Sequence, residues 1–423
     1  MKVPIVESVL VPVLLSLLVI VPIGRLVGSF AVRLRQPRAV GEIVGGLLVG
    51  SLLSWWSPGW LDTESGRASS LILGVMAQIG VVLMMFQLGM EFEFTHLRNT
   101  RLRRAIALLS VLGIAIPFAA GLAFANYYAD HVGVPDRLGF ALFAGIAFSI
   151  TALPILGRIL VERQMNDGDI GVVTFAVAGV NDLVAWVLLG AVTILVLGHG
   201  DQQEFGIRML GLFGLVAVCF TVLRPLAGRL IEAVERKHGG FGDDFLALTM
   251  AAVLAMAIGT SSLGVFAVFG GFLAGVVVYD QRVFAKAWSA RIAPFVNTVL
   301  VPIFFTYTGM RTQIGALVSA NDWLWCAGWV GAACLSKFGA CALGARLAGM
   351  PGRDALRIGI LLNTRALMEL VVLNIGMDLG LIPPKIFTML VVMALVSTVI
   401  TAPMLEWLER RPRATAKARA AAL

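Results

Sequence analysis

Residues 171–197 read GVVTFAVAGVNDLVAWVLLGAVTILVL, and this stretch decides the fold class of the chain. It is apolar and long enough to cross a bilayer, yet it holds a carboxylate, Asp182, beside Asn181. A charge at that depth costs at least ~2.5 kcal/mol, so an intramembrane carboxylate normally marks an ion or proton path. Hydrocarbon disfavours the ionised form of Asp182, whereas a bound cation favours it. One side chain can therefore hold a proton or a cation, but not both.

The rest of the chain has the same apolar character. Of its 423 residues, 59% are hydrophobic and 14% are charged, and the mean hydropathy is +0.90. A soluble domain cannot bury so much apolar surface, so the composition predicts an all-α membrane protein. We expect a transmembrane domain over residues 1–408 and a short basic cytoplasmic tail over 409–423. Glycine, proline and charge clusters divide the chain into about thirteen spans, near 4–23, 38–54, 70–92, 104–125, 138–160, 170–197, 207–231, 244–260, 262–279, 292–315, 321–348, 354–378 and 383–408.

The distribution of basic residues predicts the orientation of these spans. Of the 33 lysines and arginines, about 25 fall in alternate loops and the tail on one side, about 6 fall on the other side, and Lys337 and Arg365 lie within spans. This bias predicts an outer N-terminus and a cytoplasmic C-terminus, as in a bacterial-type inner membrane. The net charge of +8 thus indicates membrane orientation and not nucleic-acid binding.

Several function classes are disfavoured by the sequence. The four cysteines lie in apolar spans without a CxxC pair, and the four histidines are scattered over loops and span ends, which argues against a metalloenzyme. No nucleophile–base pair shares one membrane depth, so we do not expect an enzyme. The predicted loops leave no room for a nucleotide-binding domain, which excludes ATP-driven transport by this chain alone. We expect no cofactor.

Three motifs recur in the same order in the two halves of the chain. Each recurs about seven spans later, an odd number, so the two copies are predicted to cross the membrane in opposite directions. Inverted repeats with interrupted helices are typical of secondary transporters. The motif pairs are residues 45–50 with 270–275, residues 86–90 with 306–310, and the polar breaks at 149–154 with 363–366.

The two polar breaks predict discontinuous helices. Pro154 removes a backbone donor and forces its helix to yield, and Ser149 and Thr151 can satisfy the freed groups or line a cavity. The matching break at Asn363 and Thr364 favours two half-broken helices that cross and direct their dipole ends at one site. A simple proline kink is the alternative.

Charged groups within the spans suggest partners for this site. Asn181 offers an amide oxygen beside the carboxylate of Asp182, and hard cations favour such ligands. Lys337 lies too deep to reach the surface, so we expect a carboxylate partner, with Asp182 the natural candidate. The alternatives are an Asp182 bonded structurally to a hydroxyl and a Lys337 bonded to backbone carbonyls. Arg365 and Glu369 stand four apart, as a structural intrahelical pair would.

Taken together, several segments resemble one known family. They are GEIVGGLLVG (41–50), FQLGMEF (86–92), SITALPILGRIL (149–160), VNDLVAW (180–186), the span that holds Lys337, and LLNTRALMELVVLNIG (361–376). In this order, and over essentially the whole chain, they look like the monovalent cation:proton antiporter-2 family. The chain most resembles plant-type cation/proton exchangers and bacterial sodium or potassium/proton antiporters.

The resemblance implies a sodium/proton antiporter-like fold and a homodimer, each protomer with a dimerisation domain and a six-helix core that moves like an elevator. It implies that Asp182 alternately binds cation and proton, with Asn181 its neighbour and Lys337 its cationic partner. Thr151, Asn363 and Thr364 would lie at the helix crossover. Electrogenic members of related families carry two adjacent aspartates, so the Asn181–Asp182 pair favours one-for-one exchange, although a lysine that releases its proton could restore electrogenicity.

We therefore expect a secondary transporter that exchanges Na⁺ or K⁺ for H⁺ by alternating access. A sodium-coupled organic-anion symporter of similar fold is one alternative, although it would need a larger polar cavity and more carboxylates. A gated channel or an ion-sensing membrane protein is another. A channel would conduct ions without proton coupling, and a sensor would bind them without flux.

Overall fold

The computed structural model describes residues 5–34, 36, 38–56, 63–90, 100–134, 136–163, 165, 168–197, 202–365 and 367–410, and all regular structure within them is helical. Most of the predicted tail therefore lies outside the described residues. The helices are α1 (Ile5–Arg33), α2 (Arg38–Trp56), α3 (Glu64–Met90), α4 (Thr100–Val132), α5 (Arg137–Ser149), α6 (Leu153–Glu162), α7 (Asp169–Leu197), α8 (Gln202–Val218), α9 (Arg224–His238), α10 (Asp243–Ser262), α11 (Ala267–Val277), α12 (Arg282–Arg291), α13 (Ala293–Phe295), α14 (Val301–Arg311), α15 (Ala320–Leu347), α16 (Gly352–Leu362), α17 (Leu367–Asp378) and α18 (Pro384–Arg410).

The helices fall close to the predicted spans. Among the described residues, nine helices are long and apolar enough to cross a membrane, or ten if the bent pair α16 and α17 counts as one span. The three further spans that the sequence predicted fall on shorter apolar helices, at Val40–Val49, Arg137–Ser149 and Ala267–Val277. Several spans also join two elements: α8 continues into α9 through a π-helical turn at Cys219–Leu223, and α13 into α14 through another at Val296–Leu300.

Local signals explain where two important helices begin. The side chain of Asp136 caps α5 by accepting a hydrogen bond from the backbone N–H of Gly139, 3.0 Å away. Ser319 and Asp322 form a reciprocal capping box at the start of α15. Asp322 also pairs with Lys385 of α18 at 2.5 Å, so the beginnings of α15 and α18 are joined at one end of the molecule.

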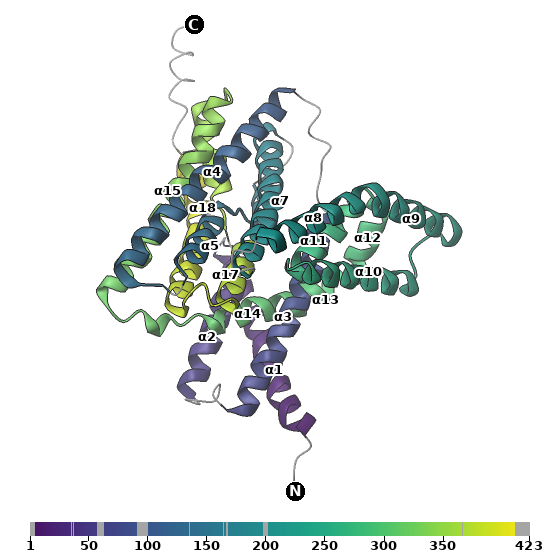
Figure 1. The fold of residues 1–423 in the computed structure, drawn as a ribbon, viewed down its shortest axis with the longest axis horizontal. Coiled ribbons are helices and arrows are strands. Elements are labelled where there is room, and N and C mark those ends of the chain that lie inside the picture. Colours follow the sequence, from purple (N-terminus) through teal and green to yellow (C-terminus); the bar gives the residue numbers. More distant parts are fainter. Residues whose placement is uncertain are drawn as a thin grey trace.

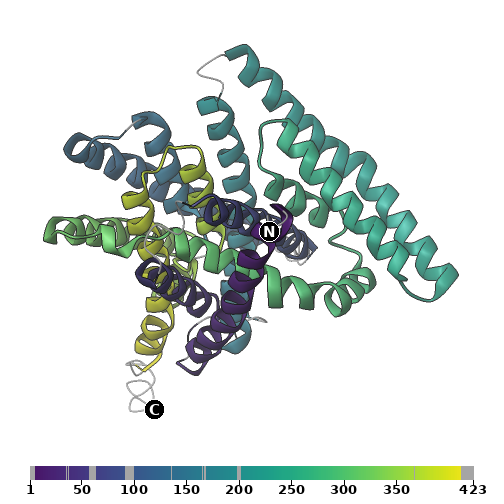
Figure 2. The same ribbon diagram turned by 90° about the horizontal axis from the view of Figure 1, so that it is seen from below.

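The helices pack in two groups. In the first, α2 packs against α1 and α14, and α3 packs against α11 and α14. In the second, α4 packs against α5, α7 and α15, and α15 packs in turn against α16 and α18. Helices α8, α9 and α10 extend to one side of both views (Figures 1 and 2).

Close glycine contacts hold the first group together. Each contact joins a motif from one copy of the inverted repeat to a motif from the other copy. A Cβ on Gly309 of α14 would lie 2.7 Å from the backbone of Gly46 in α2. A Cβ on Gly89 of α3 would lie 2.9 Å from the Cα of Gly275 in α11. These contacts pair the two copies of the sequence repeat, because residues 45–50 match 270–275 and residues 86–90 match 306–310. The glycine spacings therefore serve close helix packing.

Polar contacts also link the first group to α17, which packs against α5 and α18 of the second group. Arg311, at the end of α14, donates a 3.0 Å hydrogen bond to the side-chain oxygen of Asn374 in α17. The same guanidinium pairs with Asp378 at 2.6 Å. The amide of Asn374 in turn donates to the Thr308 hydroxyl of α14, 2.8 Å away. The half-helix α17 is thus tied to a helix of the first group.

Candidate ion-binding site

Two broken helices cross in the middle of the second group. α5 ends at Ser149, the chain runs extended through Ile150, and α6 begins at Leu153. The other break separates α16 from α17, whose axes differ by 42°. Figure 1 shows α5, α17 and α7 together near the centre of the molecule.

Hydrogen bonds between the breaks fix this crossing. The backbone N–H of Ala152 donates to the carbonyl of Thr364 at 2.9 Å. The hydroxyl of Thr151 donates to the carbonyl of Leu362, the last residue of α16, at 3.2 Å. The predicted pair of crossed discontinuous helices is therefore present. Pro154 is the second residue of α6, and its side chain lies outside the described part of the chain.

Two buried cations cap the carboxyl end of α5. The guanidinium of Arg365 donates to the carbonyls of Ala147 and Phe148, at 2.5 and 2.7 Å. The ammonium of Lys337 donates to the carbonyl of Ser149 and to that of Gly113 in α4, the latter at 2.9 Å. These α5 carbonyls have lost their helical partners at the break and form the negative end of the helix dipole. The cations thus satisfy groups that the break exposes.

Lys337 differs in one respect from the expectation. In the described structure its hydrogen bonds go to backbone carbonyls, and neither carboxylate oxygen of Asp182 accepts one from it. This arrangement matches the alternative drawn from the sequence. The two charges remain within electrostatic range of each other, so the role of Lys337 as a charge partner of Asp182 stays a prediction.

Asp182 and Asn181 lie in the interior of α7, and the part of the chain that the structure describes offers their side chains no hydrogen-bond partner. Both side chains are fully buried. Across the described residues, nothing bonds to either carboxylate oxygen of Asp182 or to either amide atom of Asn181. The side-chain oxygen of Asn363, at the second break, is also buried and has no hydrogen-bond partner within the described ranges. Such groups cost about 1–3 kcal/mol each when neutral and more when charged, so their presence together favours a site that a ligand completes.

The surroundings of α7 connect this pair with the broken helices. α7 packs against α4, α5, α6 and α16. The amide nitrogen of Asn181 would lie 3.6 Å from a Cβ on Gly113, whose carbonyl accepts from Lys337. The thiol of Cys341, one turn beyond Lys337 in α15, would lie 3.1 Å from that same Cβ. Asn181, Gly113 and Lys337 therefore belong to one neighbourhood of α4, α7 and α15.

The remaining predicted residues hold the break in place. Arg365 and Glu369 form the expected pair at 3.6 Å, and both side chains are fully buried. The single hydroxyl proton of Ser149 is shared between the carbonyl of Gly145, 2.8 Å away, and that of Ile114, 3.2 Å away. The hydroxyl protons of Ser149 and Thr151 are therefore committed to the backbone, while their oxygens retain lone pairs.

Sequence reasoning missed one residue of this region, Thr398 of α18. Its hydroxyl accepts from the backbone N–H of Arg365 at 3.2 Å, and its one proton is shared between the carbonyl of Arg365 and that of Ala394, the latter 2.9 Å away. Nearby, the hydroxyls of Thr364 and Thr401 lie 3.4 Å apart. The available signal was the group of hydroxyls at Ser397, Thr398 and Thr401 within an otherwise apolar helix.

Comparison with known proteins places the chain among ion exchangers. Residues 14–409 match the family model described as sodium/hydrogen exchanger, transmembrane. The chain is 33% identical over 405 residues to the Na⁺/H⁺ antiporter NhaS4 of Synechocystis, covering 94% of this chain and 97% of that protein. It is 32% identical to the cation/H⁺ antiporter 19 of Arabidopsis thaliana over 92% of this chain and 49% of the relative. It is 28% identical to the K⁺/H⁺ antiporter 1 of Saccharomyces cerevisiae over 88% of this chain and 43% of that protein.

A solved structure shares the fold. The sodium/proton antiporter MjNhaP1 of Methanocaldococcus jannaschii matches with a TM-score of 0.70 at 15% identity, over 95% of this chain and 99% of that one. This similarity confirms the sodium/proton antiporter-like fold. The chain spans about half the length of the plant relatives it matches and nearly all of the cyanobacterial one.

Proposed function

We propose that this chain, which belongs to the sodium/hydrogen exchanger family, exchanges a monovalent cation for protons across the membrane, with Asp182 as their shared binding group. The observation that carries the proposal is the fully buried Asp182, whose two oxygens have no hydrogen-bond partner among the described residues. An intramembrane carboxylate without a partner is most stable when it holds a proton or a cation. Both states are neutral overall, and each excludes the other.

The transport cycle follows from this competition. Protonated Asp182 is neutral and stable in its buried position. When the site faces a side with low proton concentration, the proton leaves and a dehydrated cation takes its place, held by Asp182 and by oxygens such as that of Asn181. The oxygen of Asn363 is a further candidate ligand, because it too has no hydrogen-bond partner among the residues that the structure describes. With the site exposed to either side in turn, the gradient of one ion drives the other.

The broken helices supply the electrostatic setting. The negative end of α5 would compete with Asp182 for the cation if it stayed open. Arg365 and Lys337 instead occupy its carbonyls, at Ala147, Phe148 and Ser149. Glu369, the other fully buried carboxylate at this break, lies 3.6 Å from the Arg365 guanidinium, whereas no such ion pair involves Asp182 among the described residues, so we assign the transported ion to Asp182. A single carboxylate supports one-for-one exchange.

The identity of the cation is proposed only as Na⁺ or K⁺. The relatives include an antiporter named for Na⁺ and another named for K⁺, and carboxylate and amide oxygens bind both ions. We further propose a homodimer that works by an elevator movement of the second helix group against the first. The bias of basic residues supports an outer N-terminus and a cytoplasmic C-terminus in a bacterial-type inner membrane.

Purified protein in proteoliposomes tests this function. Vesicles with an acidic lumen are diluted into pH-neutral buffer, and Na⁺, K⁺ or Li⁺ is added separately while a lumenal dye reports pH. We expect at least one cation to make the lumen alkaline, and Asp182→Asn, which is close to isosteric, to abolish the response. A folded protein that gives no response to any cation would refute exchange and favour an organic-anion symporter.

A further inference from the structure

A cluster of polar side chains joins the two helix groups where α14 and α17 end. The guanidinium of Arg311, the last residue of α14, lies 3.0 Å from the side-chain oxygen of Asn374 and 2.6 Å from that of Asp378, the last residue of α17. The amide of Asn374 donates to the Thr308 hydroxyl of α14 at 2.8 Å. We call these four residues, Thr308, Arg311, Asn374 and Asp378, the latch.

Two second-group side chains that contact the end of α14 also hold a hydrogen bond inside their own helix. The amide of Asn374 donates to the carbonyl of Leu370 at 2.8 Å. The hydroxyl of Thr388 in α18 accepts from the backbone N–H of Gln313 at 3.0 Å and donates to the carbonyl of Pro384 at 3.0 Å. Separation of the groups would therefore leave each of these side chains one partner. A buried polar group that keeps a partner costs less to move than one left without any.

Water reaches the charged pair of the latch. The side chain of Asp378 is 51% exposed, and that of Arg311 is 18% exposed. A groove of about 560 Å³ adjoins the pair, with Gln78 and Tyr307 of the first group and Asp378 of the second in its lining. An ion pair that water can reach gains little free energy when it forms and loses little when it breaks. The groups can therefore separate here without leaving a buried unpaired charge.

A contact between the groups further along α18 is longer. The side-chain amide of Gln36, between α1 and α2, donates to the carbonyl of Val399 in α18 at 3.4 Å. At a rise of ~1.5 Å per residue, Val399 lies about 17 Å further along α18 than Thr388. The described structure thus has shorter polar contacts between the groups at the latch than at this point.

We propose that the latch is a releasable gate, which closes the path to the ion site at the end of the molecule where α14 and α17 end. This inference rests on the proposed exchange by movement of one helix group against the other. α17 begins at the second break and ends in the latch, so the latch holds the broken helix against the first group. In alternating access, each side opens only when the contacts that close it are given up. The latch stabilises the state that is closed at this end.

Cross-linking tests the gate. Arg311→Cys and Asp378→Cys are combined in a variant in which alanine replaces the four native cysteines, and a short bifunctional methanethiosulfonate joins the two new thiols. The matched control links Asp322→Cys and Lys385→Cys, which replace an ion pair of 2.5 Å between α15 and α18, both in the second group. Exchange in proteoliposomes is measured before linking, after linking, and after the link is reduced.

We expect the link between positions 311 and 378 to lower the exchange rate at least about tenfold, because it prevents the groups from separating, and reduction to restore the rate. The link between positions 322 and 385 should leave the rate within about twofold, because its two helices move together. Full exchange by protein linked at 311 and 378, or equal inhibition by both links, would overturn the gate. If wild type and the unlinked variants exchange no cation, the proposed function fails instead.

Distances between the groups test the latch without transport and without its cysteine variants. Spin labels are placed on Arg67→Cys and Leu138→Cys, two exposed positions near the beginnings of α3 and α5, one in each group. Pulsed electron resonance then gives the distribution of distances between the labels. Thr308→Val weakens the latch, because it removes the hydroxyl that accepts from Asn374.

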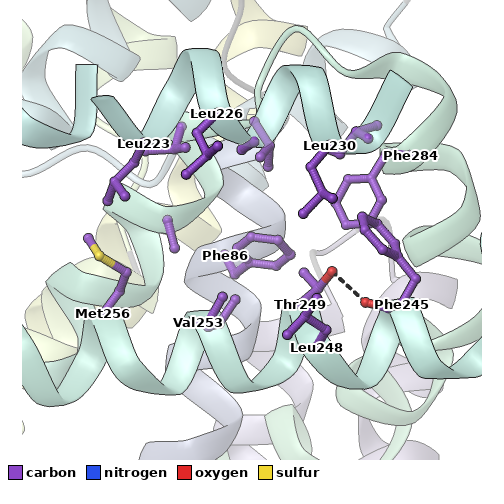
Figure 3. A pocket seen from close by; sticks show the side chains of 16 residues that line it. Phe86, Leu223, Leu226, Leu230, Phe245, Leu248, Thr249, Val253, Met256 and Phe284 are labelled. Atoms are coloured by element: carbon purple, nitrogen blue, oxygen red, sulfur yellow. Dashed lines mark hydrogen bonds between the residues drawn. The ribbon is translucent and has the colours of Figure 1, made fainter. Parts of the chain in front are cut away.

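Thr249 supplies the matched control for this measurement. Its hydroxyl donates to the carbonyl of Phe245 in its own helix at 2.9 Å, at the wall of an apolar cavity of about 220 Å³ between α9 and α10 (Figure 3). We expect Thr308→Val to raise the ratio of longer to shorter distances about fivefold, as the loss of one hydrogen bond predicts, and Thr249→Val to leave it unchanged. Identical distance distributions in wild type and Thr308→Val would overturn the proposal.

Discussion

Replacing Thr398 with valine is expected to disable the second helix break while keeping the side-chain shape. The Thr398 hydroxyl accepts from the N–H of Arg365 and donates to the carbonyl of the same residue. Valine leaves both backbone groups buried without this partner. A single unsatisfied buried group costs about 1–3 kcal/mol, so the observed break loses about 2 kcal/mol or more relative to other conformations. Since ~1.4 kcal/mol is a factor of ten, the equilibrium constant that favours the intact break over other conformations should fall at least about tenfold.

We expect this loss of stability at the break to affect the transport site through Arg365. Its guanidinium caps the carbonyls of Ala147 and Phe148, so a displaced backbone at Arg365 uncovers the negative end of α5. The assay is the initial rate of exchange in proteoliposomes as a function of cation concentration. We expect Thr398→Val to lower the maximal rate about tenfold and Thr398→Ser, which keeps the hydroxyl, to stay within about twofold of wild type.

A second threonine provides the matched control. Among the described residues, the hydrogen bond between Thr401 and the break is a weak 3.4 Å contact with the Thr364 hydroxyl, so Thr401→Val should reduce the rate far less. Wild-type exchange in Thr398→Val would refute the positioning role. Equal losses of rate in Thr398→Ser and Thr398→Val would also refute it, because the loss would then come from any change of this side chain and not from the missing hydroxyl.

Three further outcomes follow. Gly46→Ala places a Cβ 2.5 Å from the backbone of α14 and should cost about 1–3 kcal/mol, seen as a lower unfolding temperature, whereas Gly45→Ala, whose nearest contact is 3.4 Å, should be tolerated. Arg311→Gln removes the charged donor to Asn374 and should lower thermal stability by an amount worth about 1–3 kcal/mol; an unchanged unfolding curve would contradict the tie between the helix groups. Because protons compete for Asp182, apparent cation affinity should rise roughly tenfold per pH unit while that carboxyl is mostly protonated and then level off, and a pH-independent affinity would contradict the competition.

Much of the architecture was accessible from the sequence because membrane burial leaves a strong signal. Long apolar runs, the loop charges and the breaks at Pro154 and Asn363 predict the helices and where they are interrupted. The polar breaks matched by the inverted repeat also predicted the crossing, which the bond from Ala152 to Thr364 confirms. The shorter spans, such as Ala267–Val277, were recognised as apolar, but composition alone could not set their length.

The partners of the buried cations could not be predicted in the same way. Sequence pattern places Lys337 deep in its span but does not reveal that the carbonyl of Ser149, freed by a break elsewhere in the chain, lies beside it. The sequence therefore predicts a carboxylate partner for the buried ammonium, with Asp182 as the natural candidate. Thr398 was missed for a related reason: a hydroxyl in a helix usually bonds its own backbone, and only the fold shows that this one also binds Arg365.

The most direct test of the central claim is calorimetric titration of purified protein with Na⁺ or K⁺ in two buffers of different ionisation enthalpy. The difference between the two heats counts the protons released for each cation bound. Competition at Asp182 predicts release of up to about one proton per cation at a pH where this carboxyl is protonated, and neither binding nor release in Asp182→Asn. Cation binding without proton release, or binding that survives in Asp182→Asn, would contradict the account.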